Sequence, residues 1–321
     1  MSTNFISKVA IIGATGRIGG AFAEALVKTG KHTITGLTRE GSDGVLPEGV
    51  NGVPVNYDDE TCLVNAMKGH QFLVITLGAR VEEEVHKKIL AAASKAEIPY
   101  IMPNAYGYPL GHDTEIVYTK SVIQRVKDTR NTGAACITLP CGFWYEWSLA
   151  TGEQWFGFRI NQRKVTFFDD GKRVITVSTW NQCGRALAAL LSLPESGASP
   201  SIADYLNNEV RIYSFRVSQR DMLDSLHRVL GTTDADWEIT YEPAAQRIKD
   251  GAAEMAQGSI LGFGKVLYGG VFLASNELSD FANTMSTAND ALDLPVEELD
   301  EATKRTVEMV EGGWNPFNFP A

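Results

Sequence analysis

A glycine-rich segment near the N-terminus constrains the fold of this chain most strongly. Residues 8–12 read KVAII, an apolar and β-branched run, and GATGRIG follows directly at residues 13–19. From Arg17 to Thr29 the apolar residues recur at helical spacing. These patterns predict a strand, a glycine turn and a helix. In such a unit the backbone N–H groups at the start of the helix bind the pyrophosphate of a dinucleotide.

Strand and helix patterns continue to alternate beyond this turn. Strands are predicted at residues 32–37, 50–57, 72–77, 99–102 and 134–139, and helices at 62–68, 82–96 and 114–130. The run FLVITL at 72–77 is apolar throughout, as in parallel strands that are buried on both faces. The alternation predicts an α/β fold, a doubly wound parallel sheet of the Rossmann, NAD(P)-binding type.

The alternation becomes irregular after Trp147, where loops lengthen and aromatic residues gather. We therefore expect an NAD(P)-binding Rossmann domain at residues 1–153 and a smaller C-terminal substrate-binding region at 154–321. Residues 174–193 could return a strand and a helix to the first sheet. The apolar stretch 259–274 contains Lys265 and four glycines, and it is shorter than the roughly 20 residues that span a bilayer. It is expected to form a buried or pocket-lining helix.

Composition narrows the function classes. The formal charge of the 321-residue chain is -10, and no long basic run is present, so binding to nucleic acid or to an anionic membrane is not expected. The four cysteines form no CxxC pair and no metal spacing with the five histidines. The first ten residues lack the apolar stretch of a signal peptide. We expect a cytoplasmic protein with a small-molecule substrate and no metal, either a monomer or a homodimer.

The end of the second predicted strand indicates which dinucleotide is bound. It reads LTRE at residues 37–40, where an NAD-specific protein usually has an acidic residue for the ribose 2'-hydroxyl. The guanidinium of Arg39 suits a 2'-phosphate instead, which favours NADPH as the cofactor. The neighbouring Glu40 weakens this preference, and the alternative is that Arg39 is a solvated surface residue.

Several of these segments together resemble one known family. They are GATGRIGG at 13–20, TRE at 38–40, the run 53–67, FLVITLGA at 72–79 and GRALAALLSLP at 184–194. The chain resembles the NmrA-like and isoflavone-reductase-like branch of the atypical short-chain dehydrogenases/reductases, clearly over about the first 145 residues. The resemblance implies a Rossmann domain, a smaller substrate domain, a cleft between them and bound NADPH.

The resemblance also implies roles for particular residues. The phosphate contacts fall on Gly13, Thr15, Gly16, Arg17 and Ile18, and the adenosine phosphate contact falls on Arg39. Thr76, Leu77 and Gly78 would lie beside the cofactor. Asn104 and Phe143 would flank its nicotinamide ring.

The catalytic pair typical of the superfamily is absent. That pair is a Tyr and a Lys four residues apart on one helix face. Here Tyr118 and Lys120 are two residues apart, which separates them by about 200° around a helix. Tyr118 is therefore expected to be a packing residue.

Lys120 has a separate role in the resemblance. In the reductase arm of this branch a lysine early in the corresponding helix lies near the nicotinamide, and TKSVIQRVKDTR at 119–130 matches that segment in order and position. An amine there would bind the nicotinamide ribose and assist proton transfer to the substrate. The alternative is an ordinary exposed lysine on a charged helix with Arg125, Lys127 and Arg130.

Aromatic residues supply further candidates. Tyr106, Tyr108 and His112 in the loop at 104–113 are alternative proton donors, although a turn-forming or packing role is the favoured interpretation for each. In GFWYEW at 142–147, Trp144 and Tyr145 are candidate substrate contacts with Tyr106, because aromatic walls stack on planar ligands. The other interpretation of this segment is apolar core.

Three functions remain compatible with the sequence. The first is an NADPH-dependent oxidoreductase that reduces a small aromatic or conjugated molecule. The second is an NADP(H)-binding redox sensor that regulates a protein partner without turnover, as NmrA-type regulators do. The third is a non-redox isomerase or cyclase that uses the same fold.

Overall fold

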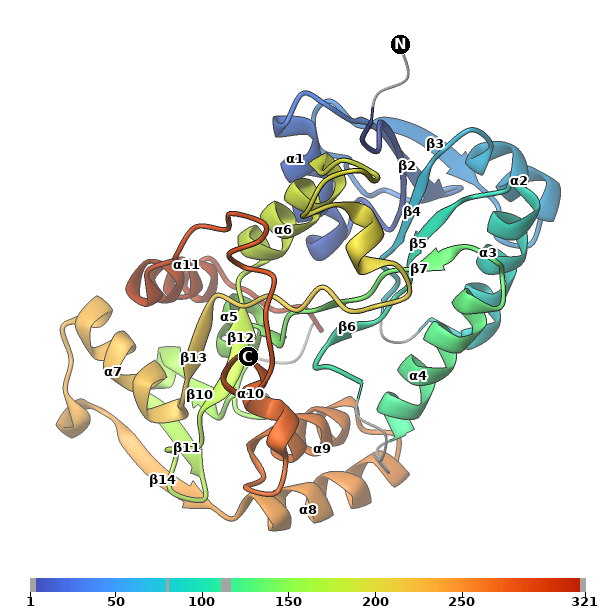
Figure 1. Ribbon diagram of the computed structural model, residues 1–321. Coiled ribbons are helices and arrows are strands. Elements are labelled where there is room, and N and C mark those ends of the chain that lie inside the picture. The colour runs from blue at the N-terminus through green and yellow to red at the C-terminus, as the bar shows by residue number, and fades with distance from the viewer. Residues whose placement is uncertain (1–3, 79–80, 111–116, 318–321) are drawn as a thin grey trace. The chain divides into compact units, whose positions relative to one another are not determined.

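The computed structural model describes residues 4–78, 81–110 and 117–317, with the side chains of 117–119 excepted (Figure 1). Its contacts divide the chain into two compact units. The first comprises Met1–Pro140, Trp180–Ile212 and Thr287–Leu294. The second comprises Cys141–Thr179, Tyr213–Ser286 and Pro295–Ala321. The boundary near residue 153 that the sequence suggested stays a prediction.

A parallel sheet of six strands forms the centre of the first unit (Figure 1). Its strands are β1 (Lys8–Ile12), β2 (Thr33–Arg39), β3 (Asn51–Val55), β4 (Phe72–Ile75), β5 (Tyr100–Met102) and β7 (Ala135–Cys136), in the order β3-β2-β1-β4-β5-β7. All four residues of β4 are buried, as its continuous apolar run predicts. The doubly wound Rossmann architecture is confirmed.

Helices cover both faces of this sheet. They are α1 (Arg17–Lys28), α2 (Glu60–Met67), α3 (Glu83–Lys95), α4 (Val117–Arg130) and α6 (Trp180–Ser192). α1 and α6 pack together on one face, and α2, α3 and α4 lie on the other (Figure 1). The short strands β6 (Tyr106–Gly107) and β8 (Leu139–Pro140) pair in parallel beside the sheet, and a 3-10 turn, η2 (Ile202–Tyr205), follows α6.

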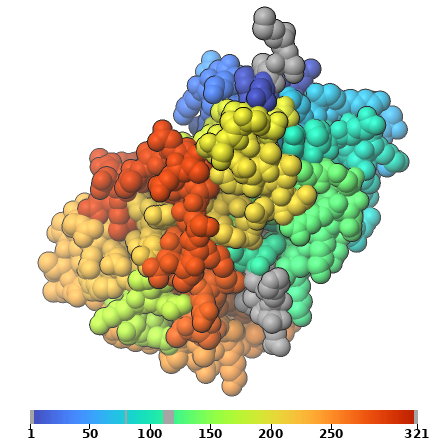
Figure 2. Space-filling view, viewed as in Figure 1, coloured from blue at the N-terminus to red at the C-terminus, as the bar shows by residue number. Residues whose placement is uncertain are grey.

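Helix α6 reaches this unit from far along the sequence. A Cβ on Gly184 would lie 2.5 Å from the carbonyl oxygen of Ala21, so the absence of a side chain lets α6 approach α1 closely. On the surface, residues 180–212 (yellow) lie beside the N-terminal residues (blue) in Figure 2, where the N–H of Glu195 donates to the carbonyl of Asn4. The preceding strand, β12 (Ile175–Ser178), pairs in a different sheet, in the second unit.

The second unit contains two small sheets. β9 (Phe143–Trp144), β12 and β13 (Phe215–Val217) form one, and β10 (Phe158–Arg159), β11 (Lys164–Phe168) and β14 (Glu238–Glu242) form the other. Its helices are α5 (Tyr145–Ala150), α7 (Gln219–Leu230), α8 (Ala244–Ala256), α9 (Ile260–Phe272), α10 (Phe281–Thr284) and α11 (Leu299–Glu311), with 3-10 turns η1 (Ile160–Gln162), η3 (Asp234–Asp236) and η4 (Glu277–Asp280).

The apolar segment expected at 259–274 forms helix α9. Its glycines allow close packing on α8, because a Cβ on Gly262 would lie 2.5 Å from the carbonyl oxygen of Gly251. Across the described parts of the chain, no helix combines the length and the apolar character that crossing a bilayer requires.

Candidate functional site

The turn between β1 and α1 leaves no room for a side chain at Gly13 or Gly19. Gly13 has φ of +81°, and a Cβ there would lie 2.3 Å from the carbonyl oxygen of Thr76. A Cβ on Gly19 would lie 2.2 Å from the carbonyl oxygen of Gly13. The hydroxyl of Thr76 donates to the carbonyl of Ile12 at 2.7 Å, which ties the end of β4 to the turn. The predicted cofactor residue Thr76 therefore also fixes the shape of the turn.

The start of α1 is suited to an anion. Its N-cap residue, Gly16, offers no side chain to its N–H groups, and its first turn has no acidic residue. Arg17 is exposed at the first helical position, within 5.8 Å of the ring centre of Trp180. An anion at the start of α1 would therefore be attracted by uncapped N–H groups, by the positive end of the helix dipole and by one guanidinium. The residues present fit a dinucleotide pyrophosphate.

Arg39 lies at the carboxyl end of β2, next to β1 in the sheet. Its side chain is exposed, and its charge reaches the phenol of Tyr57. Burial raises the pKa of Tyr57, and the positive charge of Arg39 opposes this rise. The loop that follows β2 comes close to the glycine turn, since a Cβ on Gly44 would lie 2.6 Å from the Cβ of Thr15. The loop that follows Arg39 therefore packs against Thr15 of the glycine turn.

The ends of β4 and β5 are joined by side-chain hydrogen bonds. The Asn104 amide donates to the carbonyl of Leu77 at 3.0 Å, and the Tyr106 hydroxyl donates to the carbonyl of Ile75 at 3.0 Å. Three residues that the sequence suggested separately are therefore close together in the first unit. Gly78 follows Leu77 with open space at its Cβ position.

Sequence reasoning missed an ion pair between a buried arginine and a partly exposed glutamate beside Asn104. Arg125 of α4 has a side chain only 6% exposed, and its guanidinium forms a two-point ion pair with Glu83 of α3, with Nε donating to Oε2 at 2.9 Å. Its Nη1 also donates to the carbonyl of Asn104 at 3.3 Å. The expectation of a solvated charged helix face is wrong for Arg125, because this guanidinium lies inside the protein.

A sequence signal for this burial exists. Val122, Arg125, Val126 and Thr129 are all buried and follow the i, i+3, i+4, i+7 spacing of a core-facing helix stripe. An arginine on such a stripe requires a buried partner. The identity of that partner, 42 residues away, has no local signal.

His86 of α3 is a second buried polar residue in this region. It is 2% exposed, and neither ring nitrogen has a hydrogen-bond partner among the described residues. Burial, followed by the charge of Arg125, lowers the pKa of His86 from 6.5 to about 4. The imidazole is therefore neutral at physiological pH.

Lys120 lies near the start of α4, and its side chain is exposed. Among the described residues no ion pair or hydrogen bond engages its ammonium group. Its catalytic role stays a prediction. The side chain of Tyr118 and all of His112 lie outside the described residues, and Tyr108 is half-buried.

Three predicted aromatic residues belong to the second unit. The ring of Phe143 stacks on Tyr268, with centroids 3.9 Å apart, and Trp144 is half-buried. Tyr145 is fully buried, and its hydroxyl is 2.7 Å from that of Thr303 on α11. Tyr145 therefore serves as a core residue of this unit. The roles expected of Phe143 at the cofactor and of Trp144 at the substrate stay predictions.

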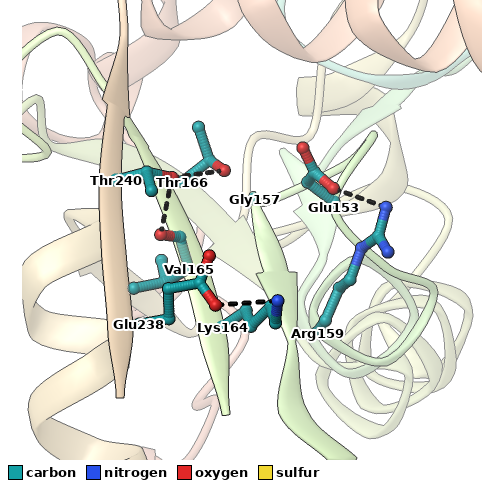
Figure 3. A pocket seen from close by; sticks show the side chains of 8 residues that line it. All are labelled: Glu153, Gly157, Arg159, Lys164, Val165, Thr166, Glu238 and Thr240. Atoms are coloured by element: carbon teal, nitrogen blue, oxygen red, sulfur yellow. Dashed lines mark hydrogen bonds and ion pairs between the residues drawn. The ribbon is translucent and has the colours of Figure 1, made fainter. Parts of the chain in front are cut away.

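A polar cavity of about 250 Å³ lies on the sheet β10-β11-β14 (Figure 3). Lys164 pairs with Glu238 at 2.7 Å, and the hydroxyls of Thr166 and Thr240, which are also cross-strand neighbours, are 3.0 Å apart. These side chains satisfy one another, as on an ordinary solvated sheet face. The remaining lining residues are Glu153, Gly157, Arg159 and Val165. The residues that line this cavity are distant in sequence from the glycine turn, and none of them is among the predicted cofactor residues.

The parallel sheet, the glycine turn and the uncapped helix define a Rossmann protein of the NAD(P)-binding type. Residues 6–118 match the model of the NmrA-like family. This match confirms the predicted resemblance to the NmrA-like family over these residues.

The similarity to known proteins covers nearly the whole length of this chain. Oxidoreductase aprR of Aspergillus flavus is 24% identical over 312 residues, which are 92% of this chain and 96% of that protein. The crystal structure of the Escherichia coli NADPH-dependent quinone oxidoreductase QOR2 with NADPH matches with a TM-score of 0.70 at 19% identity, covering 93% and 99% of the two chains. AtPrR2 with NADP+ and (+)pinoresinol matches with a TM-score of 0.72 at 18% identity, covering 94% and 99%. The structural matches establish the fold.

Proposed function

We propose that this protein is an NADPH-dependent oxidoreductase that reduces a small aromatic or conjugated organic molecule. One observation carries the proposal: an exposed guanidinium, Arg39, ends the strand beside a glycine turn that excludes side chains. That arrangement suits a dinucleotide with a 2'-phosphate. The similar proteins include an oxidoreductase, a quinone oxidoreductase complexed with NADPH and a protein complexed with NADP+ and pinoresinol.

The residues of the first unit would divide between the two halves of NADPH. Gly13, Thr15, Gly16, Arg17 and Ile18 would hold the pyrophosphate, and Arg39 the 2'-phosphate. Thr76, Leu77, Gly78 and Asn104 would border the nicotinamide half, because they follow β4 and β5. When bound, NADPH supplies the hydride. The chain supplies binding, orientation and a proton.

Lys120 is the proposed proton-handling residue. Its side chain is exposed near the start of α4, where an ammonium group suits contact with a ribose hydroxyl or a substrate oxygen. Tyr106 is a second polar group near the strand ends, but its hydroxyl already donates to Ile75. We therefore assign proton transfer to Lys120 and keep Tyr106 as a candidate substrate contact.

Cofactor preference and turnover test this proposal together. The dissociation constants of NADPH and NADH are measured by calorimetry, and NADPH oxidation is followed at the nicotinamide absorbance with a panel of quinones and conjugated carbonyl compounds. Tighter binding of NADPH than of NADH, with oxidation by at least one panel member, is expected. A preference for NADH would overturn the assignment of Arg39.

A redox sensor is the second candidate. The absence of the Tyr–Lys pair and the exposure of Lys120 favour it, because a sensor needs a binding site without proton transfer. A sensor without turnover would bind the cofactor and would oxidise no NADPH with any panel member.

A reducing, cytoplasmic location accords with the cysteines. No disulfide joins the four cysteines, all of which lie in the described part of the chain, and Cys136, Cys141 and Cys183 are buried. We propose that location for the protein, with a small molecule as its ligand and with a monomer or homodimer as its state.

A further inference from the structure

We propose that Arg125 is a positioning residue that holds the nicotinamide half of the cofactor site in shape while leaving the adenosine half unaffected. This inference rests on the proposed function, because it assumes that NADPH lies across the ends of the strands. It concerns a residue that does not itself touch the cofactor.

The contacts of Arg125 form a continuous chain toward the strand ends. Its guanidinium binds the Glu83 carboxylate on one side and donates to the carbonyl of Asn104 at 3.3 Å on the other. The side chain of Asn104 then donates to the carbonyl of Leu77 at 3.0 Å. Arg125 thus links α3 and α4 to the segment that follows β5, and the side chain of Asn104 extends this link to the segment that follows β4.

Burial makes this link rigid. The Arg125 side chain is 6% exposed, whereas Glu83 is 43% exposed. A buried guanidinium needs its partners, since an unpaired charge in the interior is costly. The hydrogen bond from Arg125 lowers the pKa of Glu83, so the carboxylate stays ionised and the pair stays intact at neutral pH. Arg125 therefore has little freedom to release Asn104.

The sheet order places this link on one side of the cofactor site. The order β3-β2-β1-β4-β5-β7 reverses direction between β1 and β4, where a dinucleotide binds across the carboxyl ends of the strands. Arg39 marks the adenosine half at β2, and Leu77 and Asn104 mark the other half at β4 and β5. Loss of Arg125 should therefore affect contacts to nicotinamide and spare contacts to the adenosine phosphates.

Arg125 also fixes how α4 is rotated. Lys120 lies five residues earlier on this helix, which corresponds to about 140° around its axis. With Arg125 held inward by Glu83, the exposed position of Lys120 follows from helix geometry. The ion pair therefore sets the direction of the proposed proton-handling residue.

Binding of NADPH and of adenosine 2',5'-bisphosphate tests the proposal, because the second ligand lacks nicotinamide. Arg125→Met keeps an unbranched apolar stem and removes the charged guanidinium, and Lys127→Met is the control on an exposed position of the same helix. Both dissociation constants are measured by calorimetry for wild type and variants. We expect Arg125→Met to bind NADPH about ten-fold more weakly, because a displaced Asn104 segment would cost NADPH binding about the free energy of one hydrogen bond. Its affinity for the bisphosphate should stay within about two-fold of the wild type.

The outcomes separate the two proposals. Equal weakening of both ligands by Arg125→Met, or no change in either, overturns the positioning role. Failure of the wild-type protein to bind either ligand overturns the proposed function instead. If Arg125→Met does not fold, Arg125→Lys decides. A lysine keeps the charge but cannot engage Glu83 at two points and Asn104 as well, so it should again weaken NADPH binding selectively.

Discussion

Gly13 and Thr76 are in such close contact that a methyl group on Gly13 would lie 2.3 Å from the carbonyl oxygen of Thr76. The two residues belong to different βα connections of the sheet, one after β1 and one after β4. Their contact explains why the glycine turn has one shape. It also makes the turn testable by single substitutions.

Gly13→Ala should destabilise the protein by about 3 kcal/mol, from an unfavourable positive φ and from the clash with Thr76. Gly30→Ala is the matched control, because Gly30 has φ of +67° but open space at its Cβ position. That control should cost about 1 kcal/mol. Urea denaturation measures both, and equal losses would show that the contact with Thr76 is unimportant.

Arg39→Ala should weaken NADPH binding about 30-fold and leave NADH binding nearly unchanged, because charge-assisted hydrogen bonds to phosphate are worth about 2 kcal/mol. Lys68→Ala removes a positive charge from another exposed position in the same unit and is the control. If both variants weakened NADPH equally, net charge rather than a 2'-phosphate contact would explain the effect.

Lys120→Ala should lower the turnover of NADPH about a hundredfold, as loss of an acid catalyst does, with little effect on protein stability because the side chain is exposed. Lys127→Ala, an exposed lysine on the same helix, should retain full turnover. Steady-state rates measure both. Full activity of Lys120→Ala would remove this lysine from the mechanism.

His86 should make the protein sensitive to mild acid. Its folded pKa is lowered to about 4 from 6.5, so the unfolded chain binds the extra proton between these values. Stability is therefore kept above pH 6.5 and is lost as pH falls toward 4. The loss from this residue amounts to about 2 kcal/mol between pH 7 and pH 5. Urea unfolding at both pH values should show a smaller loss for His86→Leu, and an unchanged loss would contradict this role.

The C-terminal segment should protect two tryptophans of the second unit. The Phe317 ring stacks on Trp155 with centroids 5.5 Å apart and meets Trp147 edge-on at 5.9 Å. Phe317→Ala should increase acrylamide quenching of tryptophan fluorescence, because it uncovers these rings. Repeating the measurement with both tryptophans replaced by Phe should abolish the increase. If the increase persisted, it would come from elsewhere.

The first unit could largely be predicted because its signals are local. The strand at Lys8–Ile12 has the predicted bounds, and the helix predicted from Arg17 to Thr29 ends one residue earlier, at Lys28. Apolar periodicity and a glycine turn are properties of neighbouring residues, so one sequence displays them. The prediction of NADPH as the cofactor likewise rests on the local position of Arg39 at the end of a strand.

The rest of the fold and of the site depends on contacts between residues that are distant in sequence. Strand β11 pairs with β14, whose sequence lies about 70 residues later, and β9 is only two residues long. The pairing of Arg125 with Glu83 and of Tyr145 with Thr303 could likewise be identified only in the folded chain. Single-sequence patterns carry no information about such partners.

Transfer of a labelled hydride is the most direct test of whether this protein reduces a substrate with NADPH. The protein is incubated without oxygen with NADPH deuterated at nicotinamide C4 and with the panel of quinones and conjugated carbonyl compounds, and the products are analysed by mass spectrometry. We expect NADP+ and a reduced product that carries deuterium when the acceptor is a carbon atom, and stoichiometric quinol when it is a quinone. Tight NADPH binding with no reduced product from any panel member, and with equal affinity for NADP+, would contradict this expectation.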